Sequence, residues 1–294
     1  MKLVTVATHS ERYYPYLKLS AEKYGHELIT LGWGQKWQGF AWKFDLMKAY
    51  LRSLKMDEIV CFVDAFDVVV LEDAPTIEGK FTKLIAGDTT KILISKEQYS
   101  HNGFENGVLS YLQSFVFTKC KSEYINSGTY IGTSSTLLRI FEGICNEFKC
   151  SPKADDQRLL QDYCVKYNDY FVIDNKCDMF LVINSTISKI KGGEYDISFL
   201  GNKLVYKNHT FPAFFHGNGY TDFDYIIEHL EYDTSIFRAD GESKSKYVWG
   251  RIMGFIPLAF QRLWVVFLIF IIVIIYIFRK YIKIFNNKRI LKYK

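Results

Sequence analysis

Two carboxylates, Asp64 and Asp67, stand three residues apart, directly after an apolar run over residues 59–63. The run predicts a buried strand, and in open parallel sheets ligands bind beyond the carboxyl ends of such strands. A turn brings side chains at i and i+3 to the same side, so both acids can share a hard divalent cation whose other ligands are phosphate oxygens. An aspartate after a strand also serves as a helix N-cap or in an Asx-turn, so both roles stay open.

A second candidate ligand is His216, which follows the apolar run 213–215 and precedes Gly217, Asn218 and Gly219. A neutral imidazole is a good ligand for Mn²⁺ or Zn²⁺. We expect the apolar run to deliver His216 into a turn, where the flanking glycines leave the backbone room to approach a phosphate. A single histidine is more often a hydrogen-bonded core or surface residue, and here the neighbouring glycines favour a binding role.

Three further acids lie at the ends of predicted elements. Glu97 follows a predicted strand over residues 91–95, and Asp155 and Asp156 precede a predicted helix. The aspartate pair has a catalytic role, or it caps the helix and interacts favourably with the helix dipole.

A loop rich in glycine and tryptophan, residues 32–39, follows a predicted strand over residues 26–31. Its aromatic and basic side chains can cover a nucleotide. The alternative is a turn in which Trp33 or Trp37 folds into the core.

These candidates must be positioned by an α/β framework. The first 31 residues predict a β-α-β opening, and the whole pattern predicts a mostly parallel sheet flanked by helices. We expect Ser127-Gly128 to interrupt one strand, because glycine inside a strand often marks a bulge or the close approach of a ligand. The predicted strands cover residues 2–7, 26–31, 59–63, 68–71, 91–95, 124–132, 171–174, 179–184 and 213–215, and helical periodicity covers residues 14–24, 41–54, 137–148 and 159–167.

The charge of the chain is divided unevenly. Of 37 Lys/Arg and 32 Asp/Glu, residues 236–294 hold 12 and 2, which leaves 37 − 12 = 25 basic and 32 − 2 = 30 acidic residues before them. The folded part is therefore acidic and the basic excess lies in the tail. This distribution argues against nucleic-acid binding by a basic face.

The six cysteines show no paired spacing and no disulfide-scaffold density, so we expect reduced thiols. The first eight residues enter a strand pattern directly, which predicts a domain made without a signal peptide and located in the cytosol. Two segments match the N-glycosylation sequon, Asn184-Ser185-Thr186 and Asn208-His209-Thr210. They can carry a glycan only if the domain is lumenal.

The C-terminal part predicts a membrane anchor. We divide the chain into a domain over residues 1–235, a polar linker over 236–254, a hydrophobic segment over 255–278 and a basic tail over 279–294. The core of the segment, residues 263–278, would span roughly 24 Å as a helix, and flanking arginines can extend this toward the ~30 Å hydrocarbon core. The basic tail favours a cytosolic location for residues 279–294, and a domain made without a signal peptide should also remain in the cytosol, so the two cues conflict. Two arrangements stay open: a tail anchor with a cytosolic domain, and a hairpin-like or interfacial insertion that keeps both ends cytosolic.

Five motifs taken in order resemble the glycosyltransferase domain of the procollagen lysyl hydroxylase and collagen glucosyltransferase family. They begin at Thr5, Phe62, Asn126, Asp155 and His216, and the resemblance covers residues 2 to 230. It implies a GT-A fold, a Rossmann-like α/β architecture, together with a UDP-sugar donor and Mn²⁺.

The resemblance also implies roles for individual residues. This sequence departs from the family's motifs at three places: it has Phe66 where the family has tyrosine, its glycine-rich segment is shortened to residues 39–42, and its acidic run is reduced to Asp155-Asp156. The implied metal ligands are Asp64, Asp67 and His216; the donor contacts are Thr8, Phe66, Trp37, Lys43, Asp64, Gly217, Asn218 and Gly219; and the groups around the transferred sugar and acceptor are Asn126, Asp155, Asp156 and Glu97.

The predicted function is that of a membrane-anchored, Mn²⁺-dependent glycosyltransferase. It would move glucose or galactose from a UDP-sugar to a hydroxyl group of a protein or glycan. The alternatives are a membrane-tethered protein that binds a nucleotide-sugar or glycan without turnover, and a metal-dependent nucleotidyltransferase, which would release pyrophosphate.

Overall fold

The computed structural model describes residues 1–97, 118–184, 190–191, 195–219 and 221–239, together with residues 268, 271–272 and 274–275. The chain divides into two compact units, residues 1–245 and 246–294. All strands of the described chain belong to the first unit.

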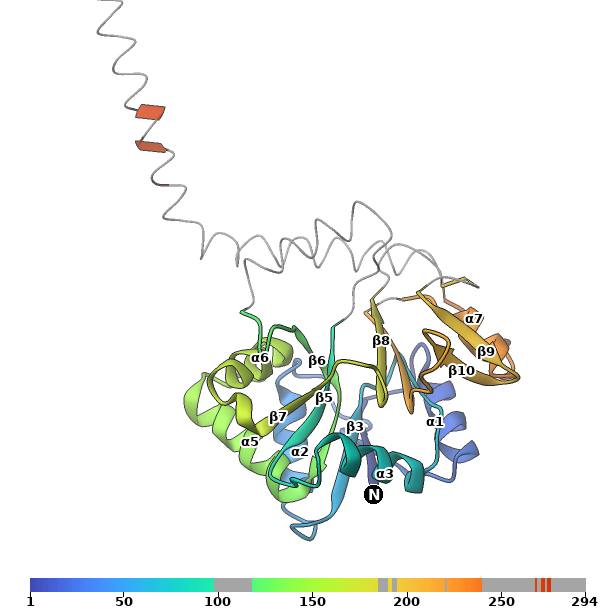
Figure 1. Cartoon of the computed structure of the whole chain (residues 1–294). Coiled ribbons are helices and arrows are strands. Elements are labelled where there is room, and N and C mark those ends of the chain that lie inside the picture. Colours follow the sequence, from blue (N-terminus) through green and yellow to red (C-terminus); the bar gives the residue numbers. More distant parts are fainter. Residues whose placement is uncertain are drawn as a thin grey trace, which may run out of the picture. The chain divides into compact units, whose positions relative to one another are not determined.

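The main sheet has the strand order β2-β1-β3-β6-β5-β7 (Figure 1). β1 pairs in parallel with both β2 and β3, and β5 pairs in parallel with β7, whereas β6 runs antiparallel to β3 and β5. The predicted β-α-β opening and the mostly parallel α/β architecture are confirmed. The strands are β1 (Lys2–Val6), β2 (Leu28–Leu31), β3 (Ile59–Val63), β5 (Ile92–Lys96), β6 (Ile125–Thr133) and β7 (Phe171–Asp174).

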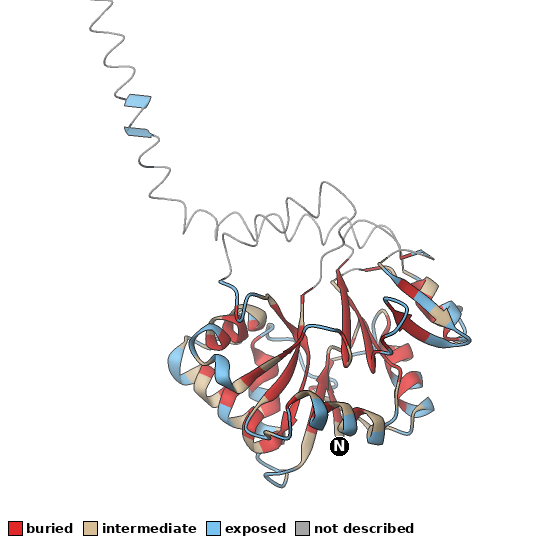
Figure 2. Ribbon diagram, viewed as in Figure 1, coloured by how far each residue is buried: buried red, intermediate tan, exposed pale blue. Residues whose placement is uncertain are grey.

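Both faces of the main sheet are covered, which explains why β3 is apolar throughout. Phe62 points to the face packed by α2, α5 and α6. Its neighbours Cys61 and Val63 point to the opposite face, which is packed by α1, α3 and a second sheet. Figure 2 shows the resulting buried strands between helices that expose their outer sides. The helices are α1 (Tyr14–Lys23), α2 (Trp42–Leu51), α3 (Ala74–Leu84), α5 (Ser134–Glu147) and α6 (Asp156–Lys166).

The second sheet has the order β4-β11-β8, with β11 antiparallel to β4 and parallel to β8. Its strands are β4 (Val68–Val70), β8 (Phe180–Asn184) and β11 (Phe214–Asn218). Because β3 ends at Val63 and β4 begins at Val68, the four residues between them carry the chain from one sheet to the other. This junction contains Asp64 and Asp67. The remaining elements are η1 (Asn168–Tyr170), the hairpin of β9 (Ile197–Leu200) and β10 (Lys203–Tyr206), and α7 (Asp224–His229).

The expected irregularity at Ser127-Gly128 is confirmed in the pairing with β5. Between the pairs Ile94–Tyr130 and Lys96–Ile125, β5 advances two residues and β6 advances five, so the bulge lies on β6 and includes Ser127 and Gly128. β6 itself continues through both residues, and all its positions are buried. Gly128 also allows a close approach of side chains, described below.

The prediction that all six cysteines are reduced is wrong for one pair. Cys120, just before β6, forms a disulfide with Cys164 of α6. Gln161, one turn earlier in α6, accepts a hydrogen bond from the Ile125 backbone N–H and donates one to the Thr118 carbonyl, which holds the two segments together. A separation of 44 residues carries no signal of such a pairing. Cys61, Cys145 and Cys150 are free thiols.

The end of the first unit packs on α1. The Tyr16 hydroxyl donates hydrogen bonds to the carbonyls of Asp233 and Phe237. The Phe237 ring meets the Tyr13 ring edge-on at 4.9 Å, and the Ala239 N–H donates to the Asp224 carboxylate. The first residues of the predicted linker, 236–239, therefore contact the domain.

The predicted membrane segment and basic tail lie outside the described residues, apart from five helical positions. Those positions, all apolar and exposed, are Leu268, Ile271, Ile272, Ile274 and Ile275. Within the described part of the chain, no helix combines the length and the apolar character needed to cross a bilayer.

Candidate functional site

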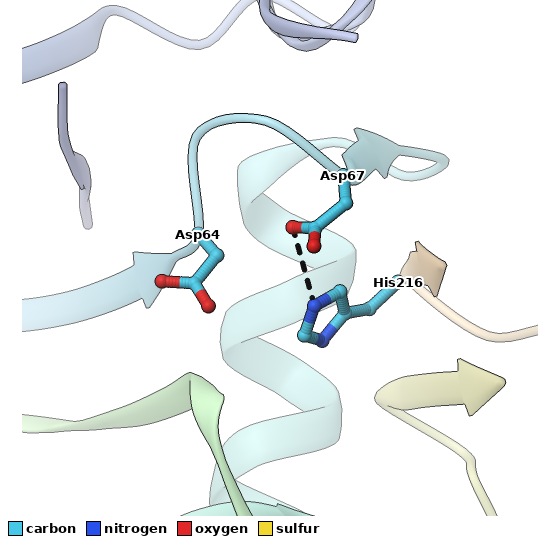
Figure 3. Close-up of side chains that lie close together, drawn as sticks. All are labelled: Asp64, Asp67 and His216. Atoms are coloured by element: carbon cyan, nitrogen blue, oxygen red, sulfur yellow. Dashed lines mark ion pairs between the residues drawn. The ribbon is translucent and has the colours of Figure 1, made fainter. Parts of the chain in front are cut away.

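Asp64, Asp67 and His216 come together at the junction of the two sheets (Figure 3). One ligand atom of each residue lies within 4.8 Å of the others. Asp64 follows β3, Asp67 precedes β4, and His216 lies within β11 opposite Val68 of β4. The histidine is thus delivered by a strand, and the predicted turn begins only after Asn218. The Gly217 N–H donates to the Asp67 carbonyl at 2.8 Å and fixes the two segments together.

Three polar atoms of this cluster, Asp67 Oδ1 and the two ring nitrogens of His216, are buried. His216 Nε2 lies 3.3 Å from Asp67 Oδ1. Among the described residues, neither that oxygen nor either ring nitrogen makes a hydrogen bond. Burial lowers the pKa of His216, but the charges of Asp67, Asp64 and Glu97 outweigh it, so the pKa is raised above its ordinary value. A buried unsatisfied group costs about 1–3 kcal/mol, and a cation between these atoms would remove that cost.

Gly128 of β6 keeps space open beside the cluster. A Cβ at this position would lie 2.4 Å from His216 Cε1 and 2.6 Å from Asp64 Oδ2. Two carboxylates and an imidazole form a ligand set that suits Mn²⁺ or Zn²⁺. The residues present therefore fit a divalent cation.

Lys43 of α2 joins this cluster to the start of α6. Its Nζ lies 3.0 Å from Asp64 Oδ1 and 2.7 Å from Asp156 Oδ2. Lys43 and Asp156 are only 6% and 5% exposed. Burial lowers the pKa of Lys43, but the charges of Asp156 and Asp64 raise it by more. The pKa is therefore above its ordinary value, and the ammonium stays charged. The ion pairs place Asp156 beside the cluster of Asp64, Asp67 and His216.

The neighbouring Asp155 has a different environment. It is exposed and is the N-cap of α6, where its carboxylate accepts a hydrogen bond from the Arg158 N–H at 3.0 Å. The two adjacent aspartates therefore separate into a surface cap and a buried ion-pair partner.

Glu97 lies at the centre of a ring of side-chain amides. Its Oε2 accepts hydrogen bonds from Asn126 at 2.7 Å and from Gln157 at 3.4 Å. Its Oε1 accepts from Asn218 at 2.7 Å and from Asn184 at 3.1 Å. Four donors fix the orientation of this buried carboxylate. The sequence predicted Glu97, Asn126 and Asn218 as site residues and missed Gln157 and Asn184, whose only signal was their place beside predicted element ends.

An aromatic shelf lies beyond β1 and β2. The half-buried Phe66 ring lies 6.4 Å from the Tyr14 ring, which Trp33 stacks on at 5.3 Å. The Thr8 carbonyl accepts the Gly34 N–H at 2.9 Å, which ties the loop to the end of β1. Trp33 and Trp37 are 51% and 41% exposed, so the alternative that places either in the core is wrong.

The same loop is attached to the segment before α6. At Gly39, with φ +127°, a Cβ would lie 2.4 Å from the Pro152 carbonyl oxygen. The N–H groups of Ala41 and Trp42 donate to the carbonyls of Ala154 and Pro152. These contacts hold the end of the loop against the segment before α6.

Arg12 is a further residue that the sequence did not identify. Its Nη1 donates a hydrogen bond to the Gly219 carbonyl at 2.6 Å. Gly219 has φ +72°, which an L side chain rarely adopts. A Cβ at Gly217 would meet the Phe223 ring at 2.4 Å. These contacts fix the turn after His216.

A family model described as "PLOD GT domain" matches residues 1–234. The "Multifunctional procollagen lysine hydroxylase and glycosyltransferase LH3" of Rattus norvegicus is 24% identical over 74% of this chain and 29% of its own length, and that of Homo sapiens is 26% identical over 74% and 30%. The chain thus spans less than a third of these relatives. A solved "glycosyltransferase involved in the glycosylation of the major capsid of PBCV-1" aligns with 79% of this chain and 99% of its own, at 13% identity and a TM-score of 0.44.

Proposed function

Because the chain belongs to the PLOD GT domain family, we propose that it is a metal-dependent glycosyltransferase of the GT-A type. It would transfer glucose or galactose from a UDP-sugar to a hydroxyl group of a protein or glycan. The observation that carries the proposal is the cluster of Asp64, Asp67 and His216, in which Asp67 Oδ1 and both ring nitrogens of His216 are buried without a hydrogen bond among the described residues.

Asp64, Asp67 and His216 would hold Mn²⁺. When bound, this cation supplies charge neutralisation for the departing diphosphate. The Lys43 ammonium balances part of the negative charge of Asp64 and Asp156. The backbone at the end of β11, over Gly217, Asn218 and Gly219, would approach the phosphate oxygens, since glycine allows close backbone approach.

The nucleoside would lie on the aromatic shelf. Phe66 offers a ring for stacking on uracil, and Thr8 and Trp37 lie on the two loops that border it. Phenylalanine retains the stacking surface of the family's tyrosine and lacks its hydroxyl group.

The transferred sugar and the acceptor would face the carboxylates beyond the metal cluster. Glu97, held by Asn126 and three other amides, is oriented to bind sugar hydroxyl groups. Asp156 would stabilise positive charge developing on the sugar or accept a proton from the acceptor. Asp155, at the exposed start of α6, would contact the acceptor.

The hydrophobic segment 255–278 would anchor the enzyme as a single membrane helix. Its apolar positions and the basic residues after it have the composition of a span with a charged flank.

The function is tested by incubating the full chain with UDP-glucose or UDP-galactose and measuring UDP, which leaves as the sugar forms a bond to the oxygen of an added hydroxyl acceptor or of water. We expect UDP formation with Mn²⁺ and its loss in EDTA. Asp67→Asn should lower turnover by about 100-fold or more, because even residues that only orient metal ligands are worth 10–100-fold. Asp57→Asn, an exposed aspartate outside the site, is the control. Release of pyrophosphate would indicate a nucleotidyltransferase, and Mn²⁺-dependent UDP binding without turnover would indicate a binding protein.

A further inference from the structure

Two free thiols lie together at the end of α5. Cys145 is in the last turn of this helix, and Cys150 follows shortly after the C-cap residue Phe148. The two side chains are hydrogen-bonded, and the Cys150 S–H is the donor, since the contact makes Cys150 harder to deprotonate. Burial and then this hydrogen bond raise the pKa of Cys150 to about 12. Both side chains are half-buried and can be reached from solvent.

The Cys145 sulfur receives a second donor, the ammonium of Lys48. Lys48 belongs to α2, which packs on α5 through the stacked rings of Phe44 and Phe141. Its Nζ lies 3.5 Å from Cys145 Sγ. An ammonium and an S–H beside a sulfur stabilise the negative charge that it carries during thiol–disulfide exchange. Two donors from different parts of the chain therefore prepare Cys145 to act as the attacking sulfur.

This pair differs from the cysteines in the core. Cys120 and Cys164 are already joined and almost fully buried, so a small disulfide in solution has no access to their sulfur atoms. Cys61 is fully buried in β3, and burial raises its pKa. Exchange requires access to the sulfur as well as negative charge on it. The half-buried pair meets both conditions.

We propose that Cys145 and Cys150 form a dithiol site that is reversibly oxidised by exchange with a small disulfide of the glutathione disulfide class. The structure holds this site in its reduced form. The inference does not depend on the proposed function, since it uses none of the residues assigned to the donor, the metal or the sugar.

The exchange has two steps. Cys145 releases its proton to solvent, and its sulfur bonds to one sulfur of glutathione disulfide; the S–S bond breaks, and one glutathione leaves and takes up a proton. Cys150 then releases its proton, its sulfur bonds to that of Cys145, and the second glutathione leaves in the same way. Two protein thiols and one glutathione disulfide thus give one protein disulfide and two glutathione thiols.

The new bond would tie the end of α5 to the segment that leads into α6. Cys150 lies two residues before Pro152 in this segment. The carbonyls of Pro152 and Ala154 accept the N–H groups of Trp42 and Ala41. Oxidation therefore adds a covalent tie beside the contacts that hold the end of the aromatic loop.

The test equilibrates the full chain with mixtures of reduced and oxidised glutathione, traps free thiols with N-ethylmaleimide and identifies unreduced peptides by mass spectrometry. We expect a disulfide between Cys145 and Cys150 that forms as the oxidised fraction of glutathione rises and is lost as it falls. The disulfide of Cys120 and Cys164 should persist in every mixture, and Cys61 should stay reduced.

Variants test the role of each group. Cys150→Ala should stop after the first step, with one glutathione attached to Cys145. Lys48→Met should slow oxidation of the intact pair by about 10-fold, because it removes the cation beside the attacking sulfur. Lys55→Met, at an exposed lysine just after α2, should leave the rate unchanged.

Two results would overturn the proposal, and both come from the wild-type chain. One is that Cys145 and Cys150 still react with N-ethylmaleimide in the most oxidising mixture, or carry glutathione without joining. The other is that Cys145 in the folded chain reacts no faster than the buried Cys61. An unchanged oxidation rate in Lys48→Met would overturn the role assigned to Lys48.

Discussion

Lys43 balances the charge of the candidate site, because its ammonium lies between two carboxylates. We expect Lys43→Met to lower the free energy of unfolding by about 3–5 kcal/mol, since it leaves Asp156 buried without its cation. Adding Asp156→Asn should recover part of the loss. The measurement is denaturant unfolding of each variant.

The matched control is Lys48→Met on the same helix. Lys48 pairs with the exposed Asp45 at 3.0 Å, so its loss should cost no more than about 1 kcal/mol. Equal losses for Lys43 and Lys48 would show that the buried bridge stabilises the fold no more than the exposed pair does.

Gly128 is predicted to be required for cation binding. In Gly128→Ala, the new methyl group would overlap His216 and Asp64, so Mn²⁺-dependent UDP binding should weaken by at least ~10-fold, which is about 1.4 kcal/mol. Isothermal titration of UDP with and without Mn²⁺ measures this. Gly79→Ala in α3, where a Cβ meets nothing within 4 Å, should leave binding unchanged. Normal binding by Gly128→Ala would argue against the cation site.

At the scale of elements, Asp174 fixes the turn between β7 and β8. Its carboxylate accepts the backbone N–H groups of Asp178, Met179 and Phe180 at 2.8–3.0 Å. Asp174→Asn replaces one acceptor with a donor, and we expect a loss of about 1–3 kcal/mol of stability. Chemical unfolding should show this loss, while Asp169→Asn, in the exposed part of η1, should change little. An unchanged free energy of unfolding in Asp174→Asn would mean that the strands alone hold the turn.

Elements with strong apolar patterns were predictable, and those stabilised by distant contacts were not. The predicted bounds of β3 and β7 match the structure because both runs are continuous and short. Helix α3 was missed because it buries only Ile77 and Phe81, and the β9–β10 hairpin because its alternation is weak and partly exposed.

The residues of the candidate site divide in the same way, into those with a local sequence pattern and those joined by distant contacts. Asp64 and Asp67 were found by their local spacing, whereas the Lys43–Asp156 ion pair and the amides around Glu97 join residues far apart in the chain. No local pattern encodes such contacts. The disulfide of Cys120 and Cys164 was missed for the same reason.

At the scale of the whole molecule, the disulfide closes a loop that includes β6 and α5. Reduction should lower the free energy of unfolding by about 2–4 kcal/mol, because the unfolded chain regains entropy. Thermal melts with and without a phosphine reductant measure the effect. A Cys120→Ala, Cys164→Ala variant should melt at the reduced value and ignore the reductant, whereas Cys145→Ala should keep the full sensitivity.

The boundary of the first unit is a further prediction. A chain ending at residue 245 should fold and leave the membrane fraction, whereas one ending at 232 should melt lower, since it loses the contacts of Phe237 and Ala239 with α1 and Asp224. Sedimentation and melting curves measure these outcomes. Aggregation of the 1–245 chain would mean that the tail belongs to the core.

The glycines that bound the aromatic loop have a consequence for chimeric enzymes. Gly32 and Gly39 both have positive φ and face atoms that would meet a Cβ, whereas residues 33–38 between them are exposed. Within this interior, Gly34 also has a positive φ and donates its N–H to the Thr8 carbonyl, so the exchangeable part is residues 35–38. Grafting the corresponding four residues from a relative, with the three glycines retained, should change nucleotide or sugar preference while the host scaffold remains folded.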